Sequence, residues 1–176
     1  MKSFKTFSGI AAPLIRVNID TDAIIPSREI KTVSKKGLSG GLFAEWRYLS
    51  LESRKENPDF ILNQDPFKKA SILVTGNNFG CGSSREHAVW ALSEWGIRAI
   101  IAPSYGSIFY SNCIKNGILP IVMDVRVISS MSEFIKDNPE ENQLTVNLIK
   151  NEVSYSNEII EPFVIQKQDK EFLING

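Results

Sequence analysis

Three short apolar runs in the middle of the chain alternate with two segments of helical periodicity. The apolar runs are rich in β-branched residues, which is typical of buried strands. In the first helical segment, Ala88, Leu92 and Trp95 recur on one face, the predicted start is Ser83 or Ser84, and Gly96 follows the end. A second helix is predicted over 107–115. The three predicted strands are 71–75, 98–102 and 118–123. This order predicts parallel strands joined by right-handed crossovers.

The flanking segments carry weaker patterns. Residues 7–16 read as a weak strand, 42–51 as a helix, and 163–176 as a charged, helical tail. Beyond Pro139, apolar residues alternate with polar ones, which predicts a strand added near the sheet edge. We therefore expect one α/β domain over residues 1–176, with a mostly parallel central sheet, helices on both faces and an antiparallel addition.

Composition and charge exclude several classes of function. The chain has 20 Lys and Arg and 20 Asp and Glu, and no basic run long enough for a nucleic-acid surface. No apolar stretch approaches the roughly 18 residues of a membrane helix, and no secretory signal is visible. Two cysteines and one histidine predict no metal site on this chain and a reducing, cytoplasmic setting. A required metal centre would have to come from another chain.

The most informative segment is the glycine-rich turn 80–87, Gly-Cys-Gly-Ser-Ser-Arg-Glu-His. It lies between a predicted strand and a predicted helix, where open α/β sheets bind ligands. Backbone N–H groups at a helix start suit a carboxylate or phosphate, and Arg85 adds a planar donor. The spacing also fits a purely structural capping box, with Ser83 as N-cap and Glu86 returning to it. The residues alone leave both interpretations open.

The stretch 80–88 resembles the signature of the swivelling domain of the aconitase superfamily. Further segments, in the family's order, resemble the small-subunit family of bacterial 3-isopropylmalate dehydratases: Asn18-Ile-Asp-Thr-Asp-Ala-Ile-Ile-Pro26, Asn78-Phe-Gly80, Ile100-Ile-Ala-Pro-Ser104, Ile108-Phe-Tyr-Ser-Asn112 and Asn116-Gly-Ile-Leu-Pro120. The resemblance covers about residues 4 to 176 and implies a β/β/α swivelling domain. It also implies a further stretch after Gly176, so we expect a shortened or natively brief tail.

The resemblance implies a hydro-lyase that works only as a complex. A large subunit would carry a [4Fe-4S] cluster, and no cofactor would be bound by this chain. The substrate would be a small dicarboxylic hydroxy acid, with 2-isopropylmalate and 3-isopropylmalate interconverted in leucine biosynthesis. Ser83 would be the base, Ser84 would hydrogen-bond the substrate, and Arg85 would clamp a carboxylate, with Gly82 allowing close backbone approach.

Other candidate residues have structural alternatives. Asp20 and Asp22 would orient Arg85 or a serine hydroxyl, or else satisfy their own backbone in an Asx-turn. His87 would contact Ser83 or the substrate, or else be a structural histidine.

The Ser-, Lys- and Gly-rich stretch 32–43 is predicted to be a mobile loop that sets substrate choice, or else an ordinary solvated loop. Its apolar candidates for an isopropyl group are Leu38, Leu42 and Phe43, and Lys35 or Lys36 would reach a second carboxylate.

Two other functions compete with this one. A homoaconitase-like or citraconate/methylmalate hydratase small subunit would share Ser83 and Arg85 and differ in the loop 32–43. A non-catalytic module would bind carboxylates without any partner. A Ser-His hydrolase is excluded, because the single histidine lies on the serine's own predicted helix.

Overall fold

The computed structural model describes residues 1–31, 33–156 and 159–176. Its strands form two four-stranded sheets, one parallel in the order β2-β3-β4-β5 and one antiparallel in the order β1-β6-β7-β8. The strands are β1 (Thr6–Gly9), β2 (Ala11–Leu14), β3 (Ile72–Thr75), β4 (Ala99–Ala102), β5 (Leu119–Val122), β6 (Leu144–Asn147), β7 (Glu152–Tyr155) and β8 (Ile159–Pro162).

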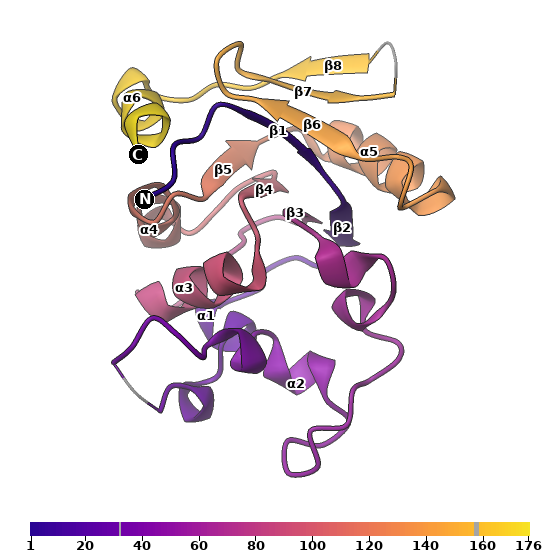
Figure 1. The fold of residues 1–176 in the computed structure, drawn as a ribbon, viewed down its shortest axis with the longest axis vertical. Coiled ribbons are helices and arrows are strands. Elements are labelled where there is room, and N and C mark those ends of the chain that lie inside the picture. Colours follow the sequence, from indigo (N-terminus) through magenta and orange to yellow (C-terminus); the bar gives the residue numbers. More distant parts are fainter. Residues whose placement is uncertain (32, 157–158) are drawn as a thin grey trace.

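The helices pack around the parallel sheet. In Figure 1, α3 lies below this sheet and the antiparallel sheet lies above it, while α5 packs against β2, β3 and β4. The helices are α1 (Thr21–Ile24), α2 (Ala44–Arg47), α3 (Glu86–Trp95), α4 (Ser107–Lys115), α5 (Val125–Asp137) and α6 (Lys167–Asn175). Short 3-10 turns are η1 (Ser27–Glu29), η2 (Ser39–Gly41), η3 (Ile61–Asn63) and η4 (Phe67–Lys69).

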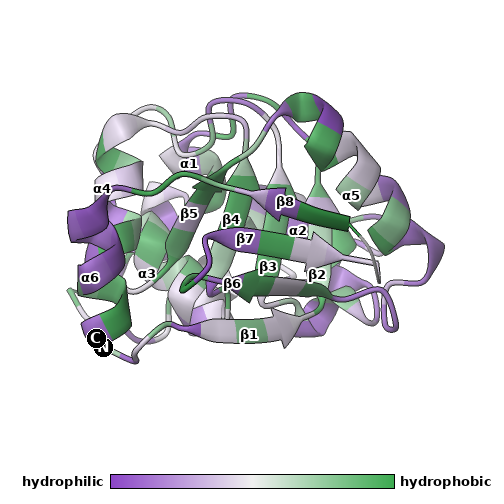
Figure 2. Ribbon diagram, turned by 90° about the horizontal axis from the view of Figure 1, so that it is seen from above, coloured by the Kyte–Doolittle hydropathy of each residue, from purple (hydrophilic) through white to green (hydrophobic). Residues whose placement is uncertain are grey.

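The parallel sheet is buried on both faces. All the residues of β2, β3 and β4 are buried, as expected for strands covered on two sides. By contrast, β6 and β7 alternate buried and half-buried positions, which is typical of a sheet with one face on the core. Figure 2 shows the corresponding green bands on the strands of the parallel sheet beneath the antiparallel one.

The strand–helix–strand–helix–strand prediction agrees with the structure, and Gly96 ends α3 in the left-handed conformation, with φ 115°. The helix predicted over 107–115 is α4, and the predicted tail contains α6, whose Leu173 is fully buried.

Several flanking predictions were wrong. The single weak strand 7–16 divides at Ile10 into β1 and β2, which belong to different sheets. The alternating strand after Pro139 is not an edge addition; it is part of the second sheet. The helix predicted over 42–51 is limited to the single turn α2.

The helix α5 was not predicted, although its sequence has helical signals. Asp124 accepts a hydrogen bond from the backbone N–H of Arg126 and so acts as N-cap. The buried face, formed by Ile128, Met131, Ser132 and Ile135, follows the helical spacing.

Candidate active site at the carboxyl ends of the parallel strands

Three loops meet beyond the carboxyl ends of β2, β3 and β4. Single bridge pairs join Asp20 to Cys81 and Phe79 to Tyr105, so the segments after the three strands run side by side. The backbone N–H of Gly80 donates to the Ile19 carbonyl at 2.7 Å. These contacts keep the loops in the same order as the strands that precede them. The predicted turn therefore lies in the middle of the sheet edge at which open α/β sheets bind ligands.

The turn requires glycine at two positions. Gly80 and Gly82 have φ of +75° and +87°, in the region that side chains rarely adopt. At Gly80, an added Cβ would also lie 2.1 Å from the ring of Phe109 in α4. Glycine is needed at position 80 because the turn packs directly against the start of α4.

A cleft of about 200 Å³ lies between the turn and the start of α4. Of the residues predicted for the site, Gly82, Ser83 and Arg85 line the cleft, while Ser84 does not. Ser83 and Ser84 are exposed, and neither hydroxyl has a hydrogen-bond partner among the described residues, while the Ser83 carbonyl accepts from the hydroxyl of Thr21 at 2.9 Å. The Ser83 hydroxyl is therefore available to a ligand in the cleft.

The predicted helix start at Ser83 or Ser84 was wrong, as was the capping box. The helix α3 begins at Glu86, and its N-cap is Arg85, with φ −108° and ψ 100°. Glu86 does not return to Ser83; its Oε1 accepts from Nδ2 of Asn116 at 2.9 Å. A short turn, in which the N–H of Arg85 donates to the Ser83 carbonyl at 2.8 Å, holds both serines before the helix. Ser83 and Ser84 therefore lie immediately before α3, and neither of them is its N-cap.

Arg85 is held in one orientation by three partners. Its Nη1 donates to Asp22 Oδ1 at 3.1 Å and to the Ile25 carbonyl at 2.7 Å, and its Nη2 donates to Ser27 Oγ at 3.2 Å. An arginine has five N–H groups, so these three bonds leave two donors, one of them on Nε. The side chain is 19% exposed and lines the cleft. A fixed pair of N–H donors suits a carboxylate.

The two predicted aspartates have different surroundings. Asp22 forms the ion pair with Arg85, whereas Asp20 Oδ1 accepts from the N–H of Ala23 at 2.7 Å as the N-cap of α1. Asp20 therefore agrees with the alternative interpretation, in which its carboxylate binds nearby backbone N–H groups. His87 lies outside the cleft, with its ring edge-on to Trp90 at 4.8 Å between centroids.

We expect Asp22→Asn to loosen the Arg85 guanidinium, because a neutral amide holds it less firmly. In nuclear magnetic resonance spectra, the Nε–H signal of Arg85 should shift or broaden in this variant and stay unchanged in the matched surface variant Asp59→Asn. Identical Nε–H signals in both variants would show that Asp22 does not position Arg85.

Sequence reasoning missed the contribution of α4. Ser107, Ile108 and Phe109 line the cleft, and Gly106, the N-cap of α4, contributes no side-chain cap. The start of this nine-residue helix therefore presents its first N–H groups on the same side as Ser83. The sequence held a signal for this contribution. A helix was predicted over 107–115 directly after the strand 98–102, so its start was expected at the same edge of the sheet as the turn.

The predicted specificity loop 32–43 needs correction. Thr32 lies outside the described residues. Leu38, Leu42 and Phe43 are at most 3% exposed and belong to the core, so their side chains cannot form an apolar surface for a ligand in this structure. Lys35 lies over the ring of Trp90, 5.0 Å from its centroid, and neither Lys35 nor Lys36 lines the cleft.

Glu94 holds this loop against α3. Its two carboxylate oxygens accept from the backbone N–H groups of Gly37 and Ser39, each at 2.6 Å. Partial burial raises the pKa of the Glu94 carboxyl, but the N–H groups of 37–39 lower it by more, so that this pKa lies below its usual value. A depressed pKa means that the attachment persists at neutral pH and weakens as the pH falls through the depressed value.

The amide signals of Gly37 and Ser39 should therefore titrate together, at a pH below the usual range of a glutamate carboxyl. In Glu94→Gln the same signals should be displaced at neutral pH and should not titrate. Nuclear magnetic resonance spectra recorded between neutral pH and about pH 3 would reveal both effects. Amide signals that stay unchanged in the wild-type protein over that range would contradict the hydrogen bonds between Glu94 and the loop.

The cysteines of this chain do not suit an iron–sulfur cluster. Cys113 is fully buried in α4, and burial raises the pKa of its thiol well above the usual value, whereas Cys81 lies in the turn. Among the described residues, no group of three or more His, Cys, Asp or Glu side chains is arranged to hold a metal ion.

No helix of the described ranges is long and apolar enough to cross a membrane.

The fold and the cleft match a known family. The profile of the aconitase C-terminal domain matches residues 1–126, which include the turn 80–87 and the start of α4. The chain therefore belongs to the aconitase C-terminal domain family.

Within this family, the chain is similar to small subunits of 3-isopropylmalate dehydratase. The chain is 49% identical to the 3-isopropylmalate dehydratase small subunit of Cupriavidus necator over all 176 of its residues, covering 85% of that protein. It is also 49% identical to the small subunit of the same name from Bacillus cereus strain B4264, covering 88% of it. A crystal structure of 3-isopropylmalate dehydratase from Methanocaldococcus jannaschii is similar with a TM-score of 0.67 and 28% identity, over 96% of this chain and 87% of that one.

Proposed function

We propose that this chain is the small subunit of a 3-isopropylmalate dehydratase and interconverts 2-isopropylmalate and 3-isopropylmalate together with a large subunit. The observation that carries the proposal is the cleft that combines a Ser83 hydroxyl without a partner in the described ranges, an oriented Arg85 and the start of α4. Full-length relatives at 49% identity support the choice of substrate.

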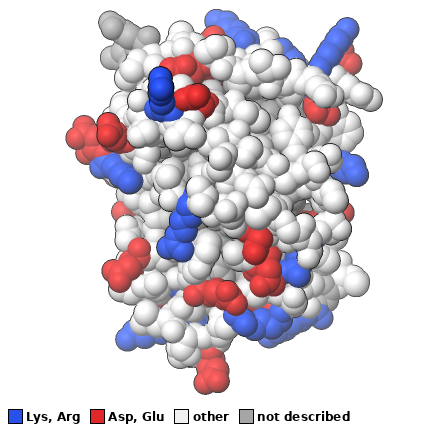
Figure 3. Space-filling view, turned by 180° about the vertical axis from the view of Figure 1, so that it is seen from behind, with Lys and Arg blue, Asp and Glu red and all other residues white. Residues whose placement is uncertain are grey.

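The charges of the cleft suit a carboxylate substrate. The two remaining donors of Arg85 would grip one carboxylate of the substrate, which orients the neighbouring carbon toward Ser83. The chain has 20 basic and 20 acidic residues, and Figure 3 shows both kinds interspersed over one face of the molecule, so the net charge would not attract an anion. Recognition would therefore depend on these local donors.

Ser83 would remove the proton from the carbon next to that carboxylate. A serine hydroxyl is a poor base in water, and its deprotonated form needs strong local stabilisation. The starts of α3 and α4 and the guanidinium of Arg85 would supply it, most strongly once a partner excludes water. Negative charge that spreads onto the carboxylate during this step would be stabilised by the same donors.

The partner would be a large subunit that covers the cleft. Exposed apolar side chains lie just beyond the carboxyl end of β2, with Ile15 and Val17 exposed by 48% and 66%. Such a grouping suits a protein contact. The large subunit would carry the [4Fe-4S] cluster, which acts as a Lewis acid on the departing hydroxyl; this chain would hold no part of it.

Ile108 is the exposed apolar side chain of the cleft, so it would contact the isopropyl group. We expect Ile108→Ala to lower kcat/KM for isopropylmalate by about tenfold, mainly through KM, because an apolar contact of this size contributes about 1–3 kcal/mol. The matched control Ile160→Ala, on the outer β8, should leave kcat/KM unchanged. An unchanged KM in Ile108→Ala would place the isopropyl group elsewhere.

Co-expression with the large subunit tests the whole proposal. The complex would be assayed without oxygen on isopropylmalate, citrate and methylmalate. We expect turnover of isopropylmalate above the others and none by the isolated chain. Preference for citrate-like or methylmalate substrates would favour the related hydratases, and carboxylate binding by the chain alone without turnover in any complex would favour a non-catalytic module.

A further inference from the structure

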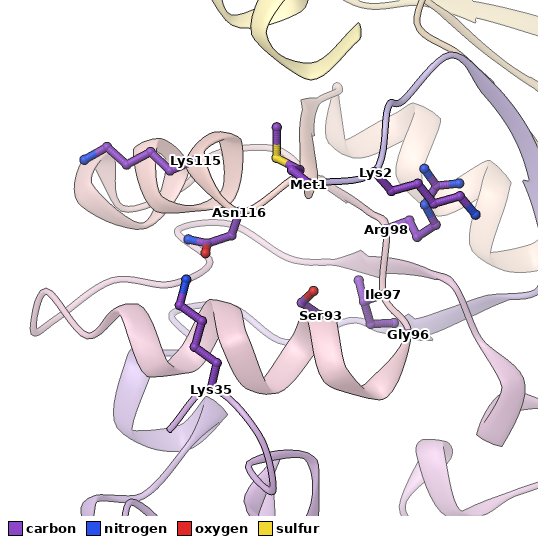
Figure 4. A pocket seen from close by; sticks show the side chains of 10 residues that line it. Met1, Lys2, Lys35, Ser93, Gly96, Ile97, Arg98, Lys115 and Asn116 are labelled. Carbon is purple, nitrogen blue, oxygen red and sulfur yellow. The ribbon is translucent and has the colours of Figure 1, made fainter. Parts of the chain in front are cut away.

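The loop 33–43 does not reach the Ser83 cleft with its own side chains. None of its described residues lines the cleft, and Leu38 and Phe43 are buried in the core. Figure 4 shows Lys35 extending toward Asn116, in a pocket at the opposite edge of the parallel sheet, where the strands begin. Within this chain, an influence of the loop on the cleft would therefore pass through other residues.

The loop packs against η1 through η2. A Cβ added at Gly41 in η2 would lie 2.5 Å from the Cβ of Glu29 in η1, closer than two such atoms can approach. Arg54 joins the same two turns, because its guanidinium binds the Glu29 carboxylate and its Nη2 donates to the Gly40 carbonyl at 3.3 Å. The side chain of Glu29 is only 8% exposed, so this carboxylate is largely shielded from water. The position of η1 therefore depends on η2.

The first residue of η1, Ser27, is one of the three partners of Arg85. Both hydrogens on Nη1 of Arg85 are used, by the Asp22 carboxylate and the Ile25 carbonyl, whereas Nη2 donates to Ser27 Oγ. Bonds at Nη1 alone would let the guanidinium pivot about that nitrogen, and a bond at Nη2 fixes its plane. The plane matters because a guanidinium binds a carboxylate through two parallel N–H groups.

Of these three partners, Ser27 is the one that η1 positions. Ile25 is fully buried, and the preceding Ile24 accepts from the backbone N–H of Phe43 at 2.7 Å, so this part of the chain is fixed in the core. Ser27 is exposed, and its place beside Arg85 depends on the position of η1. A displacement of η1 would therefore release Nη2 and leave the two bonds of Nη1 intact.

We propose that η2 sets the orientation of Arg85 through η1, with Ser27 as the positioning residue between them. The contacts form one continuous series, from Gly41 to Glu29, along η1 to Ser27, and on to Arg85. The loop would thus influence how a carboxylate is held without touching the substrate. The effect on catalysis rests on the proposed function, whereas the link between Gly41 and Arg85 does not.

The adjacent glycines of η2 provide a matched pair of variants. Neither has a positive φ, so the backbone tolerates alanine at both positions. In Gly41→Ala the new Cβ would displace η1, whereas in Gly40→Ala the nearest atom would be Nη2 of Arg54 at 4.0 Å. In nuclear magnetic resonance spectra of the full chain, the Nε–H signal of Arg85 should shift or broaden in Gly41→Ala and stay in place in Gly40→Ala.

Ser27 variants test the same link without disturbing the packing of the turns. Ser27→Ala should change the Arg85 Nε–H signal, and Ser27→Thr, which keeps the hydroxyl, should restore it. Ser8→Ala is the matched control, because it removes another exposed hydroxyl, one bonded to Thr145 at 2.7 Å in the antiparallel sheet. In Ser27→Ala/Gly41→Ala, the second substitution should add no further change, because the link is already broken.

The proposal is overturned if the Arg85 signal is unchanged in Ser27→Ala, or if the change caused by Gly41→Ala persists undiminished in the Ser27→Ala background. Should Gly41→Ala not fold, Arg54→Gln takes its place, because it breaks the bond between the two turns at a partly exposed side chain. It should change the Arg85 signal in wild-type protein and add nothing in Ser27→Ala.

Kinetics of the reconstituted complex test the consequence for the substrate. Ser27→Ala should raise KM by about tenfold and change kcat by less than about threefold, because a loosely held guanidinium loses the carboxylate equally before and during proton removal. Ser27→Thr and Ser8→Ala should keep the wild-type KM. An Arg85 signal that changes as expected while KM does not would support the link to η2 and contradict the proposed grip of Arg85 on a substrate carboxylate.

Discussion

Ser83→Ala is expected to lower kcat of the reconstituted complex by about a thousandfold, the usual range for removing a general base. The hydroxyl lines the cleft without a partner among the described residues, and both helix starts lie beside it. Alanine removes one oxygen from an exposed position, so folding and assembly should persist. Single-turnover and steady-state kinetics, with gel filtration of the complex, measure both effects.

Ser129→Ala is the matched control for this prediction. Ser129 is also exposed but lies on α5, away from the cleft. It should retain full activity. If Ser83→Ala also retains activity while assembling normally, Ser83 is not the base.

Arg85→Lys should lower kcat/KM by about a hundredfold despite conserving charge. The guanidinium binds Asp22, the Ile25 carbonyl and Ser27 at once and still has two N–H groups for a carboxylate. A lysine ammonium has three donors and no planar fork, so it cannot do both. Because the proposed grip would hold the carboxylate before and during proton removal, both KM and kcat should change.

Arg28→Lys provides the control for Arg85→Lys. Arg28 forms an exposed ion pair with Glu45, which lysine can replace at small cost. Its kcat/KM should stay within about twofold of wild type. A similar value for Arg85→Lys would mean that Arg85 contributes only charge, and the bidentate grip would have to be abandoned.

The sequence was sufficient to predict the parallel core and the turn. Buried strands carry continuous apolar runs, and Gly96 marks the end of α3, so β3, α3, β4, α4 and β5 follow from local patterns. The second sheet could not be predicted in this way. Its strands β1 and β6 pair across more than 130 residues, and alternation does not specify which partner a strand takes.

The structure brings three of the predicted site residues, Gly82, Ser83 and Arg85, into one cleft, but the local geometry differs from the prediction. The capping-box spacing at 83–86 predicted an earlier helix start, but Glu86 bonds to Asn116, a contact between distant segments. In the loop 33–43, composition suggested solvent exposure, whereas Leu38, Leu42 and Phe43 fill the core. Ile108 was not among the predicted site residues, because its place in the cleft depends on how closely α4 approaches the turn at Gly80.

Deuterium incorporation measures the proposed proton removal directly. The wild-type complex, incubated with 2-isopropylmalate in D₂O, should yield isopropylmalate with deuterium on the carbon that loses the proton, detected by mass spectrometry. The Ser83→Ala complex should bind the substrate with similar affinity and incorporate none above background. Deuterium incorporation by Ser83→Ala at the wild-type rate would contradict the assignment of this serine as the base.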